Sequence, residues 1–141
     1  MALRLAHVGL WVHDLDEALD FYTGKLGFEI REDVTLPEFG DYRWLTVGPP
    51  GTPDAALTLN VPGPPLFDGE TAAEVQRFIA QGKGGGFILN CDDCQESYEE
   101  LTARGVEFQQ PPTQVAYGID AALRDPSGNS IRIVQRMPMA V

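Results

Sequence analysis

Basic residues are scarce in this chain of 141 residues, which has 10 Lys and Arg against 21 Asp and Glu and a formal net charge of -11. Proteins that bind nucleic acid present a basic face to the phosphates, so the composition argues against nucleic acid as a partner. Anionic membrane surfaces are disfavoured because they also attract basic segments. The acidic balance instead attracts cations in general terms.

Long apolar runs are also absent. No stretch reaches the roughly 18–20 residues of a membrane span, and the first residues contain no apolar signal-peptide segment. The chain contains two cysteines, and without an export signal such a composition favours a reducing compartment. We therefore expect a cytoplasmic protein with no membrane partner, long enough for one domain with a sizeable core.

The two cysteines form the sequence Cys91-Asp92-Asp93-Cys94. This C-x-x-C spacing suits a redox pair or half of a zinc site. No second pair completes a zinc site, and the two intervening aspartates raise rather than lower the pKa of the thiols. We interpret Cys91 and Cys94 as ordinary cysteines.

An internal repeat is the most informative feature that is present. Asp14 opens a helical pattern that ends at Gly27, and Asp92, 78 positions further on, opens another that ends at Gly105. Each helical pattern follows a short apolar run and precedes three strand patterns, so the order βαβββ occurs twice. Solenoid units are shorter, about 20–50 residues. The repeat indicates two copies of one module with a cleft between them.

We therefore predict an α+β fold in a single domain over residues 1–141. Module 1 covers about 1–65, a linking helix about 70–81, and module 2 about 84–141. Thr71 and Glu74 are predicted to cap the linking helix. Strands are predicted at 5–12, 28–35, 42–48, 55–61, 86–91, 106–110, 118–124 and 130–136, and the two module helices at 15–25 and 94–104.

Period-two alternation predicts which strand residues share a face. Apolar rows such as Ala6, Val8, Leu10 and Val12, or Leu57, Leu59 and Val61, are predicted to pack against the helices. A mixed aromatic and polar surface is left on the opposite face, and such a surface is typical of a small-molecule site. A merely solvated face would favour Lys, Glu and Thr over two tryptophans. The predicted ligand-binding residues are His7, Trp11, Trp44, Thr46, Thr58, Asn60 and Arg132, with Tyr117 in a loop beside them.

Several motifs carry a family resemblance. They are AHVGLWV at 6–12, FY at 21–22 with LGF at 26–28, RWLTV at 43–47, GVEF at 105–108 and DPSGN at 125–129. Together they resemble the vicinal oxygen chelate superfamily, which contains glyoxalase I, bleomycin-resistance proteins and extradiol dioxygenases. The resemblance covers nearly the whole chain. It implies two tandem βαβββ modules forming a curved, half-barrel-like mixed sheet around a cleft, and a homodimer, since members commonly pair.

The resemblance also implies where a metal would bind. Metal enzymes of the superfamily hold a divalent cation with one residue from each of four strands, usually His or Glu. Matched position by position, those ligands fall at His7, Thr58, Gly85 and Arg132. Only His7 is a ligand, and the positive charge of Arg132 repels a dication unless its side chain swings away. The alternative role of Arg132 is a structural ion pair with one of the chain's many carboxylates. We expect no cofactor and no metal.

Two functional hypotheses follow. The first is a metal-free protein that sequesters or carries an aromatic or cationic small molecule, as bleomycin-resistance members of the superfamily do. The second is an enzyme of lyase or dioxygenase type, either metal-dependent with atypical ligands or using His7 as a general base. The identity of the ligand does not follow from the sequence.

Overall fold

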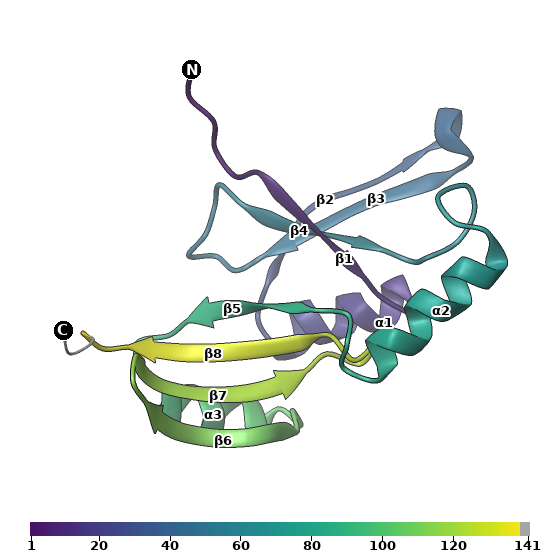
Figure 1. Cartoon of the computed structure of the whole chain (residues 1–141). Coiled ribbons are helices and arrows are strands. Elements are labelled where there is room, and N and C mark those ends of the chain that lie inside the picture. The colour runs from purple at the N-terminus through teal and green to yellow at the C-terminus, as the bar shows by residue number, and fades with distance from the viewer. Residues whose placement is uncertain (139–141) are drawn as a thin grey trace. The chain divides into compact units, whose positions relative to one another are not determined.

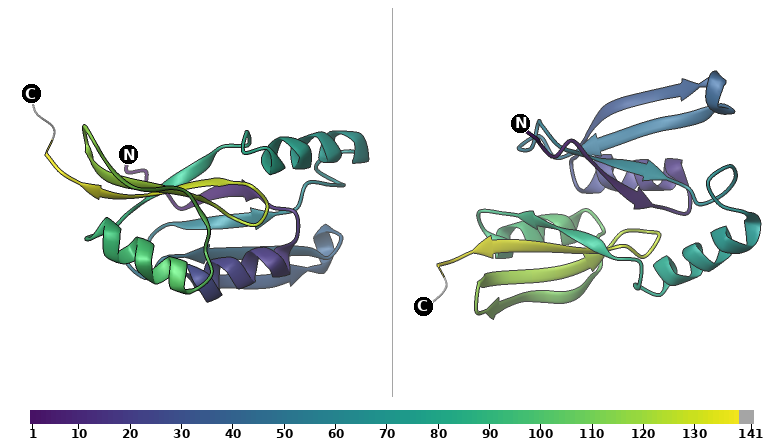
Figure 2. Two further views of the ribbon diagram at one scale, coloured as in Figure 1. Left: turned by 90° about the horizontal axis from the view of Figure 1, so that it is seen from below. Right: turned by 45° about the horizontal axis from the view of Figure 1, so that its top comes forward.

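The computed structural model describes residues 1–138 and divides into two compact units, unit 1 (Met1–Gln76) and unit 2 (Arg77–Val141) (Figures 1 and 2). Each unit contains a four-stranded mixed sheet and the element order βαβββ. This arrangement confirms the predicted α+β fold of two repeated modules. No helix within residues 1–138 has the length and apolar character needed to cross a membrane.

The helix of unit 1 is capped by Asp14, whose carboxylate accepts a hydrogen bond of 2.8 Å from the Glu17 amide. Its sheet has the order β1-β4-β3-β2, in which β1 pairs parallel with β4 and the other pairs are antiparallel. The helix α1 continues directly into a π-helical segment at Asp20–Lys25. The elements are β1 (His7–Trp11), α1 (Leu15–Leu19), β2 (Glu29–Leu36), a 3₁₀ turn (Pro37–Phe39), β3 (Tyr42–Gly48) and β4 (Ala56–Asn60).

Unit 2 repeats this plan in the sheet order β5-β8-β7-β6, with β5 parallel to β8. Its helix is capped by Asp93, which accepts from the Glu96 amide at 3.0 Å. The sequence repeat matched Asp14 to Asp92, so the predicted offset of 78 is one residue short at the helix caps. The elements are β5 (Gly86–Asn90), α3 (Cys94–Ala103), β6 (Phe108–Val115), β7 (Gly118–Arg124) and β8 (Ser130–Arg136).

Two predicted boundaries are wrong. The linking helix α2 (Gly69–Ala80) is capped by Asp68, whose carboxylate accepts from the Thr71 amide at 2.7 Å, and not by Thr71. Asp68 is a strong capping residue that the capping-box pattern at Thr71 concealed. Strand β6 continues to Val115 instead of ending at residue 110. It runs through Pro111 and Pro112 because it lies at a sheet edge, where proline is tolerated.

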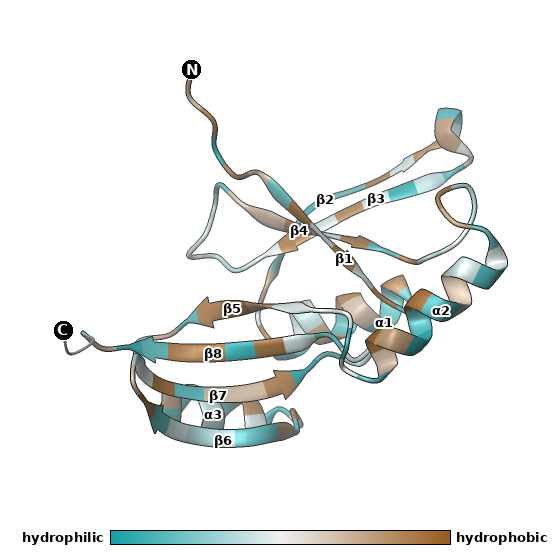
Figure 3. Cartoon of the chain, viewed as in Figure 1, coloured by the Kyte–Doolittle hydropathy of each residue, from teal (hydrophilic) through white to brown (hydrophobic). Residues whose placement is uncertain are grey.

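The core of each unit lies between one face of its sheet and its helices. Leu45, Val47 and Leu59 are buried in unit 1, and Ile131 and Ile133 in unit 2. Hydrophilic and hydrophobic residues alternate over the first part of β8, from Ser130 to Ile133, and Figure 3 shows bands of both kinds along this strand. The predicted apolar rows are shorter than expected at two places. In β1 the row is exposed at Val8 and becomes buried only from Leu10 onward, and Val61 is exposed because it lies past the end of β4.

Candidate functional site

The sheet of unit 1 has an open face opposite its core, and strand pairing defines it. Residues paired directly across neighbouring strands project to the same side. Gly9 pairs with Thr58, and Thr58 with Thr46, so alternation places every second residue around them on this face. Six predicted binding residues therefore share the open face of unit 1: His7, Trp11, Trp44, Thr46, Thr58 and Asn60.

Aromatic side chains dominate this face. The rings of His7 and Trp44 meet edge to face with centroids 5.3 Å apart. The Trp44 indole N–H donates to the Glu32 carboxylate at 3.1 Å, which fixes the orientation of the indole ring. Trp11 contacts Phe67 with a centroid distance of 5.0 Å. Phe67 follows a proline-rich loop without strand periodicity, so no sequence signal indicated its place here.

Below the aromatic residues lie two threonines. Thr46 is 0% and Thr58 6% exposed, so they form a buried floor and not an accessible wall. The hydroxyl of Thr46 has no hydrogen-bond partner within residues 1–138. Leaving a buried hydroxyl unpaired costs about 1–3 kcal/mol, so this hydroxyl lowers the stability of unit 1.

An apolar groove of about 400 Å³ adjoins the open face of unit 1. Its wall includes Tyr42, whose hydroxyl is hydrogen-bonded to the Asn60 side chain and so joins the groove to the predicted binding residues. Phe39 and Leu66 expose large apolar surfaces beside it. The groove is lined by Leu36, Phe39, Tyr42, Val61, Gly63, Pro64, Pro65 and Leu66. A concave, mostly apolar surface with few polar groups suits the body of a small organic molecule.

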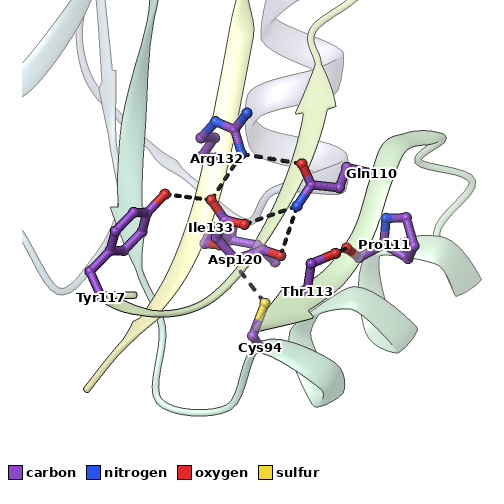
Figure 4. Close-up of polar contacts among 8 residues, drawn as sticks. All are labelled: Cys94, Gln110, Pro111, Thr113, Tyr117, Asp120, Arg132 and Ile133. Atoms are coloured by element: carbon purple, nitrogen blue, oxygen red, sulfur yellow. Dashed lines mark hydrogen bonds and ion pairs between the residues drawn. The ribbon is translucent and has the colours of Figure 1, made fainter. Parts of the chain in front are cut away.

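The two remaining predicted residues, Tyr117 and Arg132, lie in unit 2 and converge on Asp120 (Figure 4). Asp120 is 1% exposed and accepts hydrogen bonds from Arg132 Nη1 at 2.9 Å, the Tyr117 hydroxyl at 2.7 Å and Gln110 Nε2 at 2.9 Å. Its carboxylate raises the pKa of Tyr117, chiefly by accepting the hydroxyl hydrogen bond. Of the two alternatives for Arg132, the structure contains the ion pair with a carboxylate of the chain.

Sequence reasoning missed Asp120 and Gln110. Alternation within 118–124 offered a signal, because it puts Asp120 on the same side as Gly118 and Ala122. The register between β7 and β8 does not follow from the sequence, and it pairs Ala122 with Arg132 and so brings Asp120 close to the guanidinium. The carboxylate partner of Arg132 was therefore one among many candidates.

The residues at the superfamily's metal positions do not supply a donor set. In β1 Gly9 pairs with Thr58, and in β5 Ile88 pairs with Arg132. His7 and Gly86 each lie two residues before these positions, so they are equivalent in the two units. The register thus corrects the predicted Gly85 to Gly86, which also has no side-chain donor. Thr58 is buried, and Arg132 is held in its ion pair. Within residues 1–138, no group of three or more His, Cys, Asp or Glu side chains is arranged to hold a metal ion.

The two cysteines are free thiols, Cys94 as the first residue of α3 and Cys91 in the segment between β5 and α3. Burial is the main cause that raises the pKa of both, that of Cys94 to about 11. The Cys94 sulfur lies 3.8 Å from the carbonyl oxygen of Ile133. The raised pKa values agree with the interpretation of Cys91 and Cys94 as ordinary cysteines, because the reactive thiolate form is disfavoured at both positions.

Comparison with known families gives one match that covers most of the chain. The sequence model of the glyoxalase/bleomycin resistance protein/dioxygenase superfamily matches residues 4–133. Among relatives, an uncharacterized protein of Shewanella frigidimarina is 35% identical, over 96% of this chain and 95% of its own length. Lactoylglutathione lyase of Escherichia coli O157:H7 is 26% identical, over 94% of this chain and 93% of its own.

Solved structures give the same result. The crystal structure of UcmS2 has a TM-score of 0.87 and 42% sequence identity, covering 96% of this chain and 99% of its own. The structure of TnmS3, an antibiotic binding protein from Streptomyces sp. CB03234, has a TM-score of 0.75 and 28% identity, covering 97% and 99%. The chain is thus similar along nearly its full length to structures that include a small-molecule binder.

Proposed function

The chain belongs to the glyoxalase/bleomycin resistance protein/dioxygenase superfamily, and from this premise we propose that it is a metal-free protein that sequesters or carries an aromatic or cationic small molecule. The aromatic open face of unit 1 is the observation that supports the proposal most directly. Trp11, Trp44 and His7 offer ring faces and edges for stacking, and the adjoining groove offers apolar contact. The similarity to an antibiotic binding protein supports the same class of ligand.

Tryptophan fluorescence tests this proposal, because both tryptophans of the chain lie on the open face of unit 1. The probes are acridine orange, an aromatic cation, and 2-naphthoate, an aromatic anion. We expect saturable quenching by acridine orange and weaker quenching by 2-naphthoate, since the net charge of -11 favours the cation. If no compound in a wider panel of fused-ring aromatics quenches the tryptophan fluorescence in a saturable way, the proposal is wrong.

An enzyme is the second candidate. It is favoured by the similarity to lactoylglutathione lyase and by His7, whose imidazole is exposed on the open face and is the side chain most often used as a general base. In this alternative His7 acts as a general base, or a metal binds through atypical ligands. Formation of lactoylglutathione from glutathione and methylglyoxal, assayed with and without added nickel or zinc and compared with His7→Ala, decides between binding and catalysis.

Absence of a metal belongs to the proposal and has its own test. Protein purified without chelators is expected to contain less than one equivalent of nickel, zinc, iron or manganese per chain, because Thr58, Gly86 and Arg132 stand where ligands would be needed. Elemental analysis measures this directly. If one equivalent of such a metal remained bound after dialysis against a chelator, the result would contradict the proposal and favour the metal-dependent enzyme.

We further propose a homodimer in the cytoplasm. Each unit has two edge strands, β1 and β2 in unit 1 and β5 and β6 in unit 2, and covering such edges is favourable. Light scattering at micromolar concentration is expected to return twice the chain mass. A monomer mass at all concentrations tested would remove this part of the proposal.

A further inference from the structure

We propose that the open face of unit 2 binds an oxyanion group of a small molecule, a carboxylate or a phosphate, between Arg124 and Arg132. This site lies on a different unit from the aromatic face and prefers the opposite charge. The inference therefore goes beyond the proposed function and stands independently of it.

A pocket of about 280 Å³ lies around these two arginines. Arg124 pairs with Ser130 across β7 and β8, and Ala122 pairs with Arg132, so the two arginines are diagonal neighbours on one face of the sheet. The backbone positions of diagonal neighbours stand about 7–8 Å apart, so both long side chains can reach one oxyanion in the pocket that they line. The pocket is lined by Gln109, Gln110, Ala122, Leu123, Arg124, Ser130, Ile131 and Arg132.

Both guanidinium groups keep hydrogen-bond donors without an acceptor in residues 1–138. Arg132 donates through Nη1 to Asp120 at 2.9 Å and to Gln110 at 3.5 Å, which leaves its Nε and Nη2 groups. Arg124 makes no side-chain hydrogen bond or ion pair with the described part of the chain, and it is exposed. Arginine pairs with carboxylates and phosphates through such parallel donors.

The local charge is positive although the chain is acidic. Asp120 neutralises Arg132 and is the acidic residue that this face contributes beside the pocket. The lining residues Gln110, Ala122 and Ser130 carry no charge, so the charge of Arg124 is left uncompensated. An incoming oxyanion supplies the missing negative charge.

Arg124 lies against the backbone of Gly82 and has no polar partner within residues 1–138. Its guanidinium lies against Gly82 so closely that a Cβ at this glycine would be 2.5 Å from Nη2. Gly82 also has a φ of 76°, which favours glycine. The last carbonyls of α2 already accept from the amides of Gly82 and Lys83, so Arg124 is not needed to cap the helix.

The test is a titration with inorganic phosphate and, separately, with acetate, at constant ionic strength maintained with sodium chloride. The arginine Nε–Hε resonances report binding by nuclear magnetic resonance. We expect saturable shifts at Arg124 and Arg132 and an affinity about fivefold or more weaker in Arg124→Gln. A preference for phosphate identifies a phosphate-bearing ligand, and equal or better binding of acetate a carboxylate-bearing one.

Arg136→Gln is the matched control, since Arg136 lies on the same face of β8, loses the same charge and does not line this pocket. It is expected to change the affinity by less than about twofold. Equal weakening by both substitutions, or no saturable shift with either anion, overturns the inference. Because both tryptophans lie in unit 1, failure of aromatic binding leaves this readout intact.

Discussion

The two units place different side chains at equivalent positions of one backbone plan. Thr46 pairs with Thr58 in unit 1, and Ala122 pairs with Arg132 in unit 2, so Trp44 and Asp120, each two residues earlier, correspond. Both are held by a side chain from the adjoining edge strand, Trp44 by Glu32 and Asp120 by Gln110. One unit thus presents an indole ring where the other buries a carboxylate.

The difference separates what the fold requires from what it leaves open. On the core side, Leu59 pairs with Leu45 and Ile133 with Ala121, so both units keep apolar pairs there because packing permits little else. On the open side, the two units have unlike residues at equivalent positions, Trp44 in one and Asp120 in the other. We infer that unit 1 keeps its open face for ring stacking, and that unit 2 uses part of its face for an internal ion-pair network.

The largest effect is expected from Asp120→Ala, which removes the common acceptor of three side chains in unit 2. Buried polar partners that lose their acceptor are costly, although Arg132 is 44% exposed and regains some hydration. We expect the free energy of unfolding to fall by about 2–3 kcal/mol, measured by urea denaturation.

Glu32→Ala is the matched control in unit 1. Glu32 holds Trp44 as Gln110 holds Asp120, but it is exposed, so its loss is expected to cost less than about 0.5 kcal/mol. Equal costs for the two substitutions would mean that the network of unit 2 is no more structural than the surface contact of unit 1.

Trp44→Ala sharpens the comparison on the side of binding. Loss of a stacking partner is expected to weaken binding of an aromatic ligand by about tenfold, which corresponds to roughly 1.4 kcal/mol. Stability is expected to change little, because Leu45 and Val47 supply the core side of β3. Calorimetry with acridine orange measures the affinity, and Trp44→Phe, which retains a ring, is expected to restore most of it. Ile88→Ala, on the open face of unit 2, is expected to leave the affinity unchanged.

The sequence was sufficient to predict the fold and to predict which residues lie on the open face of unit 1. Alternation placed His7, Trp11 and Trp44 on one side of the sheet, because β1 and β3 both pair with β4 without a register shift. It was not sufficient to predict burial on that face, since the depth of Thr46 depends on neighbouring side chains from other strands. It also did not determine the Arg132 partner, which requires strand register. Local patterns specify faces, whereas contacts between strands depend on pairing.

Thr46→Val tests the buried floor of unit 1. The unpaired hydroxyl of Thr46 has no counterpart in unit 2, where Ala122 occupies the equivalent position. Replacing it with a methyl group of similar shape is expected to raise the free energy of unfolding by about 1 kcal/mol. Thr113→Val, which removes an exposed hydroxyl in unit 2, is expected to stay within about 0.5 kcal/mol of the original protein. A Thr46→Val protein that is less stable than the Thr113→Val protein would show that the Thr46 hydroxyl has a partner in solution.

The smallest effect is a pH dependence that unit 2 has through Tyr117. Hydrogen bonding to Asp120 raises the pKa of this phenol, so the folded state favours the protonated hydroxyl. The resulting stabilisation is complete below the ordinary tyrosine pKa of about 10 and is lost as the pH rises through the higher pKa of the folded state. We therefore expect the difference in unfolding free energy between the original protein and Tyr117→Phe to be constant from pH 7 to 9 and to decline above pH of about 10. The Asp120→Ala background isolates the cause, because alanine at position 120 removes the carboxylate that accepts the hydrogen bond of the phenol. If the effect of Tyr117→Phe declines equally in both backgrounds, Asp120 is not the origin of the shift, and the network of unit 2 is weaker than its distances indicate.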